Sequence, residues 1–391
     1  MKRLLFICCC ALIALLSCEK KDTSSLPFVK IYDDQNGNRS FTPLSIIKST
    51  QDHGYIVLSA FDGWRIQLMK IDNDGVFEWN LELPDAYVNA VPNLVNIDQH
   101  IYLVCMDPIE LNTRILRIDE ANHAVIPVSV LEEVSYPLYA EYAVDNLMLL
   151  SSPLGSQITL IQKVSPLLDT VIQVGALDIS MNVDDYLIKH SMHSGKQWPF
   201  FIKSTPEKDR FVVNGFYNYS FSTVFLDNNL QFSGVYNGAA MDGGINQLLP
   251  LGAGSYALSR ISGEYLFNNA NCSLDPSAIA MATSIEAQGD SELNHESPVL
   301  IESLTIKGVT YRAYVASTHS NQLSLKLYYE SGKKIAGTYL SKNIPIKACD
   351  MIQTPYGELL ILTQVRVMGS YNRIGAIKLS KANLEALVTP E

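Results

Sequence analysis

Two closely spaced histidines are the first residues in the chain whose spacing could support chemistry. His190 and His193, in the segment KHSMHSGKQW, are three residues apart and would project from one side of a helix. In that position they could bind a metal together, with Asp184 or Asp185 as a third ligand. No HExxH or comparable frame surrounds them, so a solvated loop insertion is the competing interpretation.

A second candidate for a metal is the segment Asp72-Asn73-Asp74-Gly75. The carboxylates of Asp72 and Asp74, closely spaced and followed by glycine, are ligands that suit a hard cation such as calcium. The segment lacks the distal glutamate of an EF-hand. Asn, Asp and Gly are also the residues that tight turns select, so an ordinary turn is the alternative.

The densest aromatic cluster of the chain suggests a different kind of chemistry, the stacking of a sugar or peptide. Its members are Trp198, Phe200, Phe201, Phe216, Tyr217, Tyr219 and Phe221. Because alternate side chains of a strand face opposite sides, about half of them are expected to pack in the core. The others could form a binding platform, for which Trp198, Tyr217 and Tyr219 are the candidates.

No motif for nucleophilic catalysis is present. The sequence contains no GxSxG and no cysteine–histidine frame, and its 40 acidic residues are scattered. Beyond the N-terminal segment there are three cysteines, Cys105, Cys272 and Cys349, and no CxxC. Two of them lie in apolar runs, which favours buried free thiols, although one disulfide among the three stays open.

The elements that must position these residues are short strands. Ser45–Leu83 contains four apolar runs separated by turn residues, with Gly54 and Asp62-Gly63 at two of the turns. Four antiparallel strands in fewer than 40 residues form one sheet that cannot bury both of its faces alone. The segment therefore predicts stacked neighbours of the same kind.

This unit recurs along the chain in less regular form. The polar turn that ends its third strand marks each copy, at Asp72, Asp119, Ser165, Asp227, loosely near Ser284, Tyr329 and Ser380. Second strands precede these marks as YIVLSA, HIYLVCM, NLMLLSS, RFVVNGF, SYALSRI, TYRAYVAS and ELLILTQV. Seven units with this spacing predict an all-β fold, a seven-bladed β-propeller of four-stranded blades, with six or eight blades as alternatives.

The two ends of the chain are expected to close this ring. Val29–Tyr32 is strand-like and precedes the first full unit, whereas the last unit has only a weak fourth strand in LEALV. We expect Val29–Tyr32 to complete the blade made by residues 347–381, so that no blade edge is left open. Helical periodicity is nearly absent, and short helices are expected only at residues 184–190 and 381–386.

One segment carries a resemblance to known propellers. In DNDGVFEW, residues 72–79, an Asp and Gly turn is followed by a tryptophan, which resembles the repeats of PQQ-type, quinoprotein-like propellers. That resemblance implies that Trp79 docks against the next blade. The other units lack the tryptophan, so no quinone cofactor is expected. The repeats also resemble those of uncharacterised Bacteroidetes-type lipoproteins, over most of the chain.

The N-terminus predicts export and lipidation. Lys2 and Arg3 precede the apolar run Leu4–Leu16, which is too short to span a bilayer, and Leu15-Leu16-Ser17-Cys18 resembles a bacterial lipobox. The expected organisation is a signal peptide at 1–17, a lipid-anchored tether at 18–27 and one propeller domain at 28–391. Lipid on Cys18 would attach the protein to the outer membrane of the cell envelope, on either face.

Charge and composition narrow the function classes. The net charge is −11 and no run of Lys or Arg follows the leader, so no nucleic-acid partner is expected. The sequence favours a binding or scaffolding module for a protein or glycan, without a cofactor, and leans against an enzyme. The alternatives are a glycan-directed hydrolase or lyase with its site in the central channel, and a periplasmic scaffold for envelope assembly.

Overall fold

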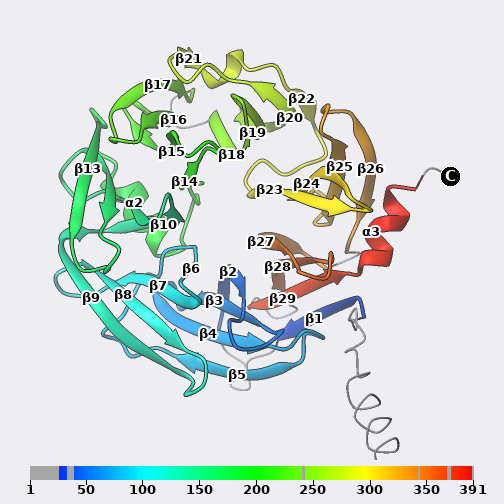
Figure 1. Ribbon diagram of the computed structural model, residues 1–391, viewed down its shortest axis with the longest axis horizontal. Helices are drawn as coiled ribbons and strands as arrows, with labels where there is room; N and C mark the ends of the chain where they lie inside the picture. Colours follow the sequence, from blue (N-terminus) through cyan, green and yellow to red (C-terminus); the bar gives the residue numbers. More distant parts are fainter. Residues whose placement is uncertain (1–25, 33–38, 240–242, 342–343, 368–370, 390–391) are drawn as a thin grey trace, which may run out of the picture.

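The chain forms a ring of seven β-sheets around a central axis (Figure 1). The computed structural model describes residues 26–32, 39–239, 243–341, 344–367 and 371–389. Each sheet is a blade whose first four strands run antiparallel from the axis outwards, which confirms the seven-bladed propeller. Cys18 and the segment expected as the signal peptide lie outside the described residues.

The blades are numbered along the chain. Blade 1 contains β2 (Phe41–Lys48), β3 (Tyr55–Phe61), β4 (Arg65–Ile71) and β5 (Phe77–Glu82). Blade 2 contains β6 (Val95–Ile97), β7 (His100–Met106), β8 (Asn112–Asp119) and β9 (Ala124–Ser135). Blade 3 contains β10 (Pro137–Ala143), β11 (Asn146–Ser151), β12 (Ile158–Val164) and β13 (Val171–Asp178). Blade 4 contains β14 (Phe201–Ser204), β15 (Arg210–Tyr217), β16 (Ser220–Asp227), β17 (Phe232–Asn237) and an added strand, β21 (Ile279–Met281).

The remaining blades follow the same order. Blade 5 contains β18 (Gly243–Gly252), β19 (Ser255–Ser262), β20 (Tyr265–Ser273) and β22 (Gln288–Asp290). Blade 6 contains β23 (Val299–Ile306), β24 (Val309–Ser317), β25 (Leu323–Tyr329) and β26 (Lys334–Tyr339). Blade 7 contains β27 (Ile346–Gln353), β28 (Leu359–Arg366), β29 (Asn372–Leu379) and β1 (Phe28–Tyr32).

The position of a strand within its blade explains its residue pattern. The second strand of blade 1, β3, is buried along its whole length, because its sheet is covered by a neighbouring blade on each face. The outermost strand, β5, is mostly exposed. Trp79 is the buried residue of β5, and it stacks on His123 of blade 2 with 4.9 Å between the ring centroids. Trp79 thus docks against the next blade.

The N-terminal strand closes the ring. Strand β1 pairs antiparallel with β29, so that Phe28 lies opposite Lys378 and Tyr32 opposite Ile374. This is the pairing expected from the sequence. The LEALV segment is not a strand: Leu384 and its neighbours form helix α3 (Lys381–Leu387), which begins with a capping box at Ser380. The other helix predicted from the sequence is α2 (Asp184–Ser191).

The fifth repeat mark was placed wrongly. The third strand of blade 5 is β20, which ends at Ser273, whereas Ser284 belongs to the short 3-10 helix η1 (Ala282–Ser284). The chain between them leaves blade 5 and adds β21 to blade 4 as a parallel strand. The fifth repeat is therefore hard to recognise in the sequence, because the apolar run around residue 280 belongs to blade 4 and not to blade 5.

A repeated lysine contact joins consecutive blades. Lys70 of blade 1 reaches Glu120 of blade 2, with 3.3 Å between Nζ and Oε2, at the turn after the third strand. Lys163 of blade 3 donates to the carbonyl of Asn228 at the corresponding turn of blade 4, at 3.2 Å. Lys378 of blade 7 donates to a carbonyl at the same turn of blade 1. The third strands therefore carry a lysine that fastens each of these blades to the next.

Two further features concern the helices and the cysteines. Among the described residues, no helix is long and apolar enough to cross a membrane. Cys105, Cys272 and Cys349 are free thiols, the first two of them buried.

Candidate functional site

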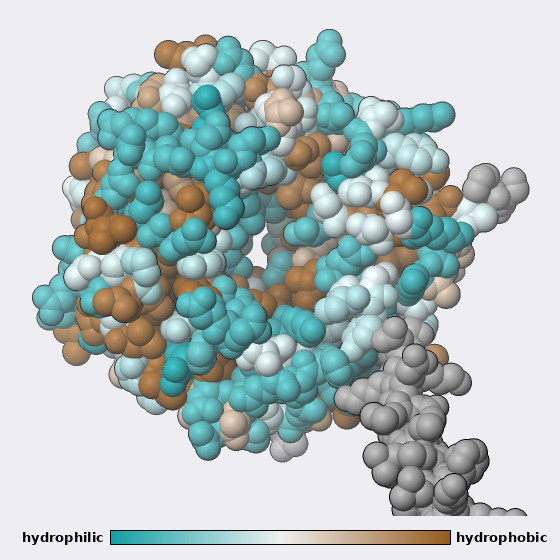
Figure 2. All heavy atoms as spheres, in the orientation of Figure 1, coloured by the Kyte–Doolittle hydropathy of each residue, from teal (hydrophilic) through white to brown (hydrophobic). Residues whose placement is uncertain are grey.

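The central channel is the site on which all seven blades converge. A cavity of about 470 Å³ lies on the axis and is lined by the first strand of each blade or by the residues just before it. Figure 2 shows the ring hollowed at its centre, with both polar and apolar residues at the rim. A volume of this size is typical of small-molecule sites, which cover roughly 300–1,000 Å³.

Four charged side chains line the channel, and we call them the channel cluster. They are Glu141 on β10, Lys203 on β14, Glu302 on β23 and Asp350 on β27. Each interrupts a strand that is otherwise largely apolar, and each comes from a different blade. The ring architecture is therefore what brings together residues as far apart in sequence as positions 141 and 350.

Lys203 and Glu141 form the ion pair of this cluster. Their Nζ and Oε2 atoms are 3.2 Å apart, and the two side chains retain 30% and 25% of their exposure, so water in the channel still reaches them. Burial lowers the pKa of Lys203, but Tyr139, Glu141 and Glu302 outweigh it and raise the pKa above its ordinary value. Lys203 is therefore a permanent cation in the channel wall.

Asp350 is held by backbone donors. Its Oδ2 accepts a hydrogen bond from the Ile46 amide of blade 1, and its Oδ1 accepts one from the Met351 amide, both at 2.8 Å. Burial raises the pKa of Asp350 to about 6, although these hydrogen bonds and Lys203 act in the opposite direction. The carboxylate is thus fixed in place between blades 7 and 1.

Glu302 has the more strongly shifted carboxyl group. Burial, together with the negative charges of Asp350 and Glu141, raises its pKa to about 7, against a smaller opposing effect of Lys203. Among the described residues, no cation lies within 4 Å of it. At neutral pH this carboxyl group is about half protonated, so it can either donate or accept a hydrogen bond.

Backbone irregularities direct side chains into the channel. The first strands of blades 1, 3, 5 and 7 each have a register shift, which falls just before Ser45, Tyr139, Gln247 and Asp350. A bulge turns the following side chains relative to the sheet. Tyr139, Gln247 and Asp350 all line the cavity, so the bulges set which residues face the axis.

The rest of the channel wall is apolar or unreactive. Leu44, Ile46 and Ile352 supply aliphatic surface beside the channel cluster. Cys349 also lines the cavity, but burial raises its pKa to about 12, so the thiol stays protonated at neutral pH and is a poor nucleophile. The channel wall also includes uncharged polar residues such as Asn93, Asn246 and Gln247, so it mixes polar and apolar surface.

The aromatic residues proposed from the sequence do not form one platform. Trp198 is buried, Phe216 and Phe221 pack on it with ring centroids 5.0 Å away, and it lines the channel cavity. Tyr217 stacks on Phe232 of the same blade. Tyr219 is 66% exposed at the turn between β15 and β16. Most of these rings pack in the core, whereas Trp198, Phe200 and Phe201 also line the channel and Tyr219 is exposed at the surface.

The metal sites proposed from the sequence are not assembled. Over the described part of the chain, no group of three or more His, Cys, Asp or Glu side chains could hold a metal ion. The Nδ1 atom of His190 accepts a hydrogen bond from the Trp198 amide, and Asp184 accepts one from the Gly155 amide. Burial lowers the pKa of His190 to about 3 and that of His193 to about 4, so both rings are neutral; His190 is buried and His193 is half-buried.

The Asp72–Gly75 segment is an ordinary turn. The Oδ1 atom of Asp72 accepts hydrogen bonds from the amides of Asp74 and Val76, at 2.9 and 2.7 Å. These bonds make the carboxylate part of the turn itself, which explains the Asp at this position without a bound cation.

The channel cluster was missed in the sequence, although a signal for it exists. Its members are charges inside short, mainly apolar runs: LYAEYA, FFIKS, VLIESL and, with a second charge at Lys347, KACDMI. Each run lies in the first strand of its blade, just before the second strand that marks the repeat. Once the blade order is known, a charge in the middle of a first strand is a candidate for a channel residue, whereas Lys48 and Lys347, at the ends of their first strands, do not line the cavity.

Comparisons with known proteins give the fold. No protein family matches the sequence, and no curated protein does. Among solved structures, the core factor of S. cerevisiae has a TM-score of 0.52 at 9% identity, covering 94% of this chain and 63% of its own. The periplasmic gluconolactonase of Pseudomonas aeruginosa has a TM-score of 0.48 at 11% identity, covering 81% and 93%. A Bacteroides caccae protein of unknown function has a TM-score of 0.38 at 11% identity, covering 64% and 82%.

The likeness to the core factor extends to the fold alone. This chain spans 63% of the length of the core factor chain that it matches. At identities near 10%, shared architecture carries no information about the site, since propellers host unrelated functions.

Proposed function

We propose that this protein is an exported, lipid-anchored β-propeller that binds a small hydroxylated ligand, a glycan fragment, in its central channel. The observation that carries the proposal is the channel cluster in a cavity of about 470 Å³. Lys203 supplies hydrogen-bond donors, Glu141 and Asp350 supply acceptors, and Glu302 supplies either.

The mixture of groups suits a sugar better than a protein segment. Sugar hydroxyl groups both donate and accept, so they can pair with an ammonium and with carboxylates in the same small space. The apolar faces of a pyranose ring can lie against aliphatic residues such as Ile46 and Ile352. The Lys203–Glu141 pair is partly exposed, so a ligand can replace the water around its two charges. This replacement does not create an unpaired buried charge, and it therefore avoids that desolvation cost.

Titration with a panel of neutral mono- and disaccharides tests the proposal. The mature chain, from residue 18 onwards, should bind at least one member, and Lys203→Met should weaken that binding by at least tenfold. Lys189→Met, which removes an exposed lysine on α2, is the matched control and should bind like the wild type. Equal binding by both variants would place the ligand outside the channel.

A glycan hydrolase is a second candidate, favoured by the protonation of Glu302. A carboxylic acid with a pKa of about 7 can act as a general acid at neutral pH, with Asp350 as a second carboxyl group in the same channel. The test is the release of reducing sugar from a ligand found by the titration. Release by the wild type that is lost in Glu302→Gln, with binding retained, would support hydrolysis; no release by the wild type would leave binding as the function.

Lipid anchoring is the third part of the proposal, and it rests on the lipobox-like segment that ends at Cys18. We expect the expressed protein to partition into the membrane fraction and Cys18→Ser to be released from it. Protease added to intact cells then distinguishes the two faces, because only a surface-exposed propeller would be digested. Recovery of the wild type in the soluble fraction would contradict anchoring.

A further inference from the structure

A second cavity lies between blades 5 and 6, away from the channel. Its volume is about 590 Å³, and it forms because the fourth strand of blade 5 is very short. Strand β22 pairs only with Leu266–Asn268 of β20. Beyond Asn268 the neighbouring segment at 283–287 stands away from β20 and is tied to it by a hydrogen bond from the Asn269 side chain to the Glu286 carbonyl, at 2.7 Å. The resulting crevice is open to solvent.

One end of this crevice presents a buried cation. Arg260 is 7% exposed, its Nε donates to the Ile285 carbonyl at 3.2 Å, and its guanidinium lies 4.3 Å from the centre of the Phe267 ring. In the part of the chain that the structure describes, no Asp or Glu lies within 4 Å of it. Burial lowers its pKa, as expected for a cation without a counter-charge. A buried charge is normally paired, so this guanidinium is suited to receive an anion.

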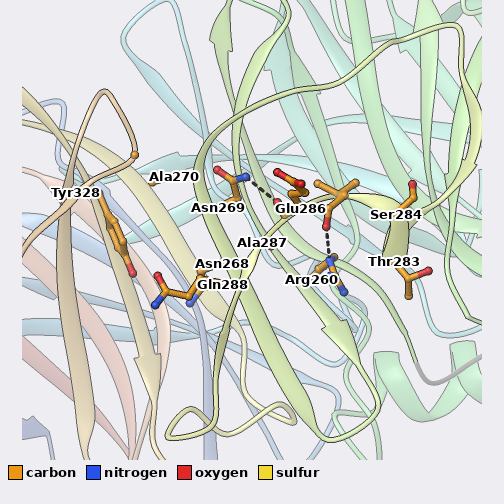
Figure 3. Close-up of a pocket in the computed structure, with 12 residues that line it drawn as sticks. Arg260, Asn268, Asn269, Ala270, Thr283, Ser284, Glu286, Ala287, Gln288 and Tyr328 are labelled. Atoms are coloured by element: carbon orange, nitrogen blue, oxygen red, sulfur yellow. Dashed lines mark hydrogen bonds between the residues drawn. The ribbon is translucent and has the colours of Figure 1, made fainter.

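The other end presents neutral polar groups. Figure 3 shows the Asn268 carboxamide and the Tyr328 hydroxyl at one end of the cavity and Arg260 at the other. Asn268 is 6% exposed, and neither its Nδ2 nor its Oδ1 has a hydrogen-bond partner. Leaving such a group unsatisfied costs about 1–3 kcal/mol, which a ligand that pairs with it would recover. The group needs an acceptor and a donor together, and hydroxyl groups provide both.

We propose that this crevice is a second binding site and that it takes a hydroxylated monocarboxylate, such as a sugar that contains a uronic acid. The carboxylate would pair with the planar guanidinium of Arg260, and hydroxyl groups would pair with Asn268 and Tyr328. A dianion such as phosphate fits less well, because there is one cation and Glu286 also lines the cavity. The site is independent of the channel, since the two cavities share no lining residue.

Calorimetric titration of the mature chain with a glucuronate-containing disaccharide tests this site, with cellobiose and inorganic phosphate as comparison ligands. We expect Arg260→Met to weaken binding of the acidic disaccharide by at least tenfold, and Arg260→Lys to weaken it less. Arg366→Met, which changes an exposed arginine, is the matched control and should not alter it. Cellobiose should show no dependence on Arg260.

A second variant separates binding from folding. Asn268→Leu removes two unsatisfied polar atoms, so it should keep or raise the melting temperature while weakening binding of the acidic disaccharide by at least threefold. Loss of that binding in Lys203→Met together with its retention in Arg260→Met would move the ligand to the channel and overturn the crevice site. Phosphate binding of equal strength that depends on Arg260 would overturn the choice of a carboxylate. Unchanged binding in Asn268→Leu would contradict its role.

Discussion

Replacing Glu302 by Gln tests the electrostatics of the channel. In the folded protein the pKa of Glu302 is raised from its ordinary 4.5 to about 7. A raised carboxyl pKa means that the folded state binds more protons than the unfolded state between these two values. The resulting stability is therefore fully present below pH 4.5 and is lost as the pH rises through 7. Above pH 7 the wild type carries an ionised carboxylate in an unfavourable position.

The size of the effect follows from the shift. The full change in pKa corresponds to about 3 kcal/mol. The side chain is only half-buried and the channel contains water, so screening reduces this value to about 1–2 kcal/mol. Because Gln cannot ionise, Glu302→Gln should be more stable than the wild type by about 1–2 kcal/mol at pH 8, and nearly equal to it at pH 4.5.

Urea unfolding of both proteins at several pH values between 4.5 and 8.5 measures this difference. Glu264→Gln, which changes an exposed glutamate, serves as the control and should give a small difference at every pH. A stability difference for Glu302→Gln that does not change with pH, or that has the opposite sign at pH 8, would refute the placement of Glu302 in a low-dielectric channel wall.

Two further predictions concern the scaffold around the site. The pKa values of His190 and His193 are lowered to about 3 and 4, so the free energy of unfolding should fall as the pH drops below 6.5, by about 2 kcal/mol for each histidine at pH 5. In urea unfolding, His190→Gln should lose less of this free energy between pH 6.5 and pH 5 than the wild type does. An equal loss in the two proteins would contradict burial of the neutral ring. Lys378 and Glu358 form a fully buried ion pair in the blade that β1 closes, with Nζ and Oε2 3.5 Å apart. Because Lys378→Met would leave the Glu358 carboxylate buried without a partner, it should reduce the free energy of unfolding by about 3–5 kcal/mol. Adding Glu358→Gln should restore part of that loss, and a loss below 1 kcal/mol for Lys378→Met alone would show that the pair is unimportant.

The sequence predicts the architecture well because each repeat has its own local pattern of apolar runs and turn residues. Apolar runs of strand length, separated by turns such as Asp62-Gly63, mark all seven second strands, and each of them is a strand in the structure. The prediction was wrong near Ser284, where the chain leaves its own blade to extend blade 4. Local pattern does not report which sheet a strand joins, because pairing depends on the path of the chain between blades.

The site was harder to predict, for a physical reason. Which side chain of a first strand faces the axis depends on bulges such as the one before Asp350, and a shift of one residue reverses the faces. The candidate site residues chosen from the sequence were instead histidines, aspartates and aromatic residues, which were selected for their residue type and not for their position in a blade. The rings of His190 and Trp198 are buried in the core, where aromatic packing uses the same residues that ligand binding would.

The most direct test of the channel as a ligand site is calorimetric titration of the mature chain with the glycan panel, comparing the wild type, Lys203→Met and Lys189→Met. We expect a neutral sugar to bind the wild type and Lys189→Met equally and to bind Lys203→Met at least tenfold more weakly. Binding of the same strength to all three proteins, or binding to none of them, would contradict this expectation.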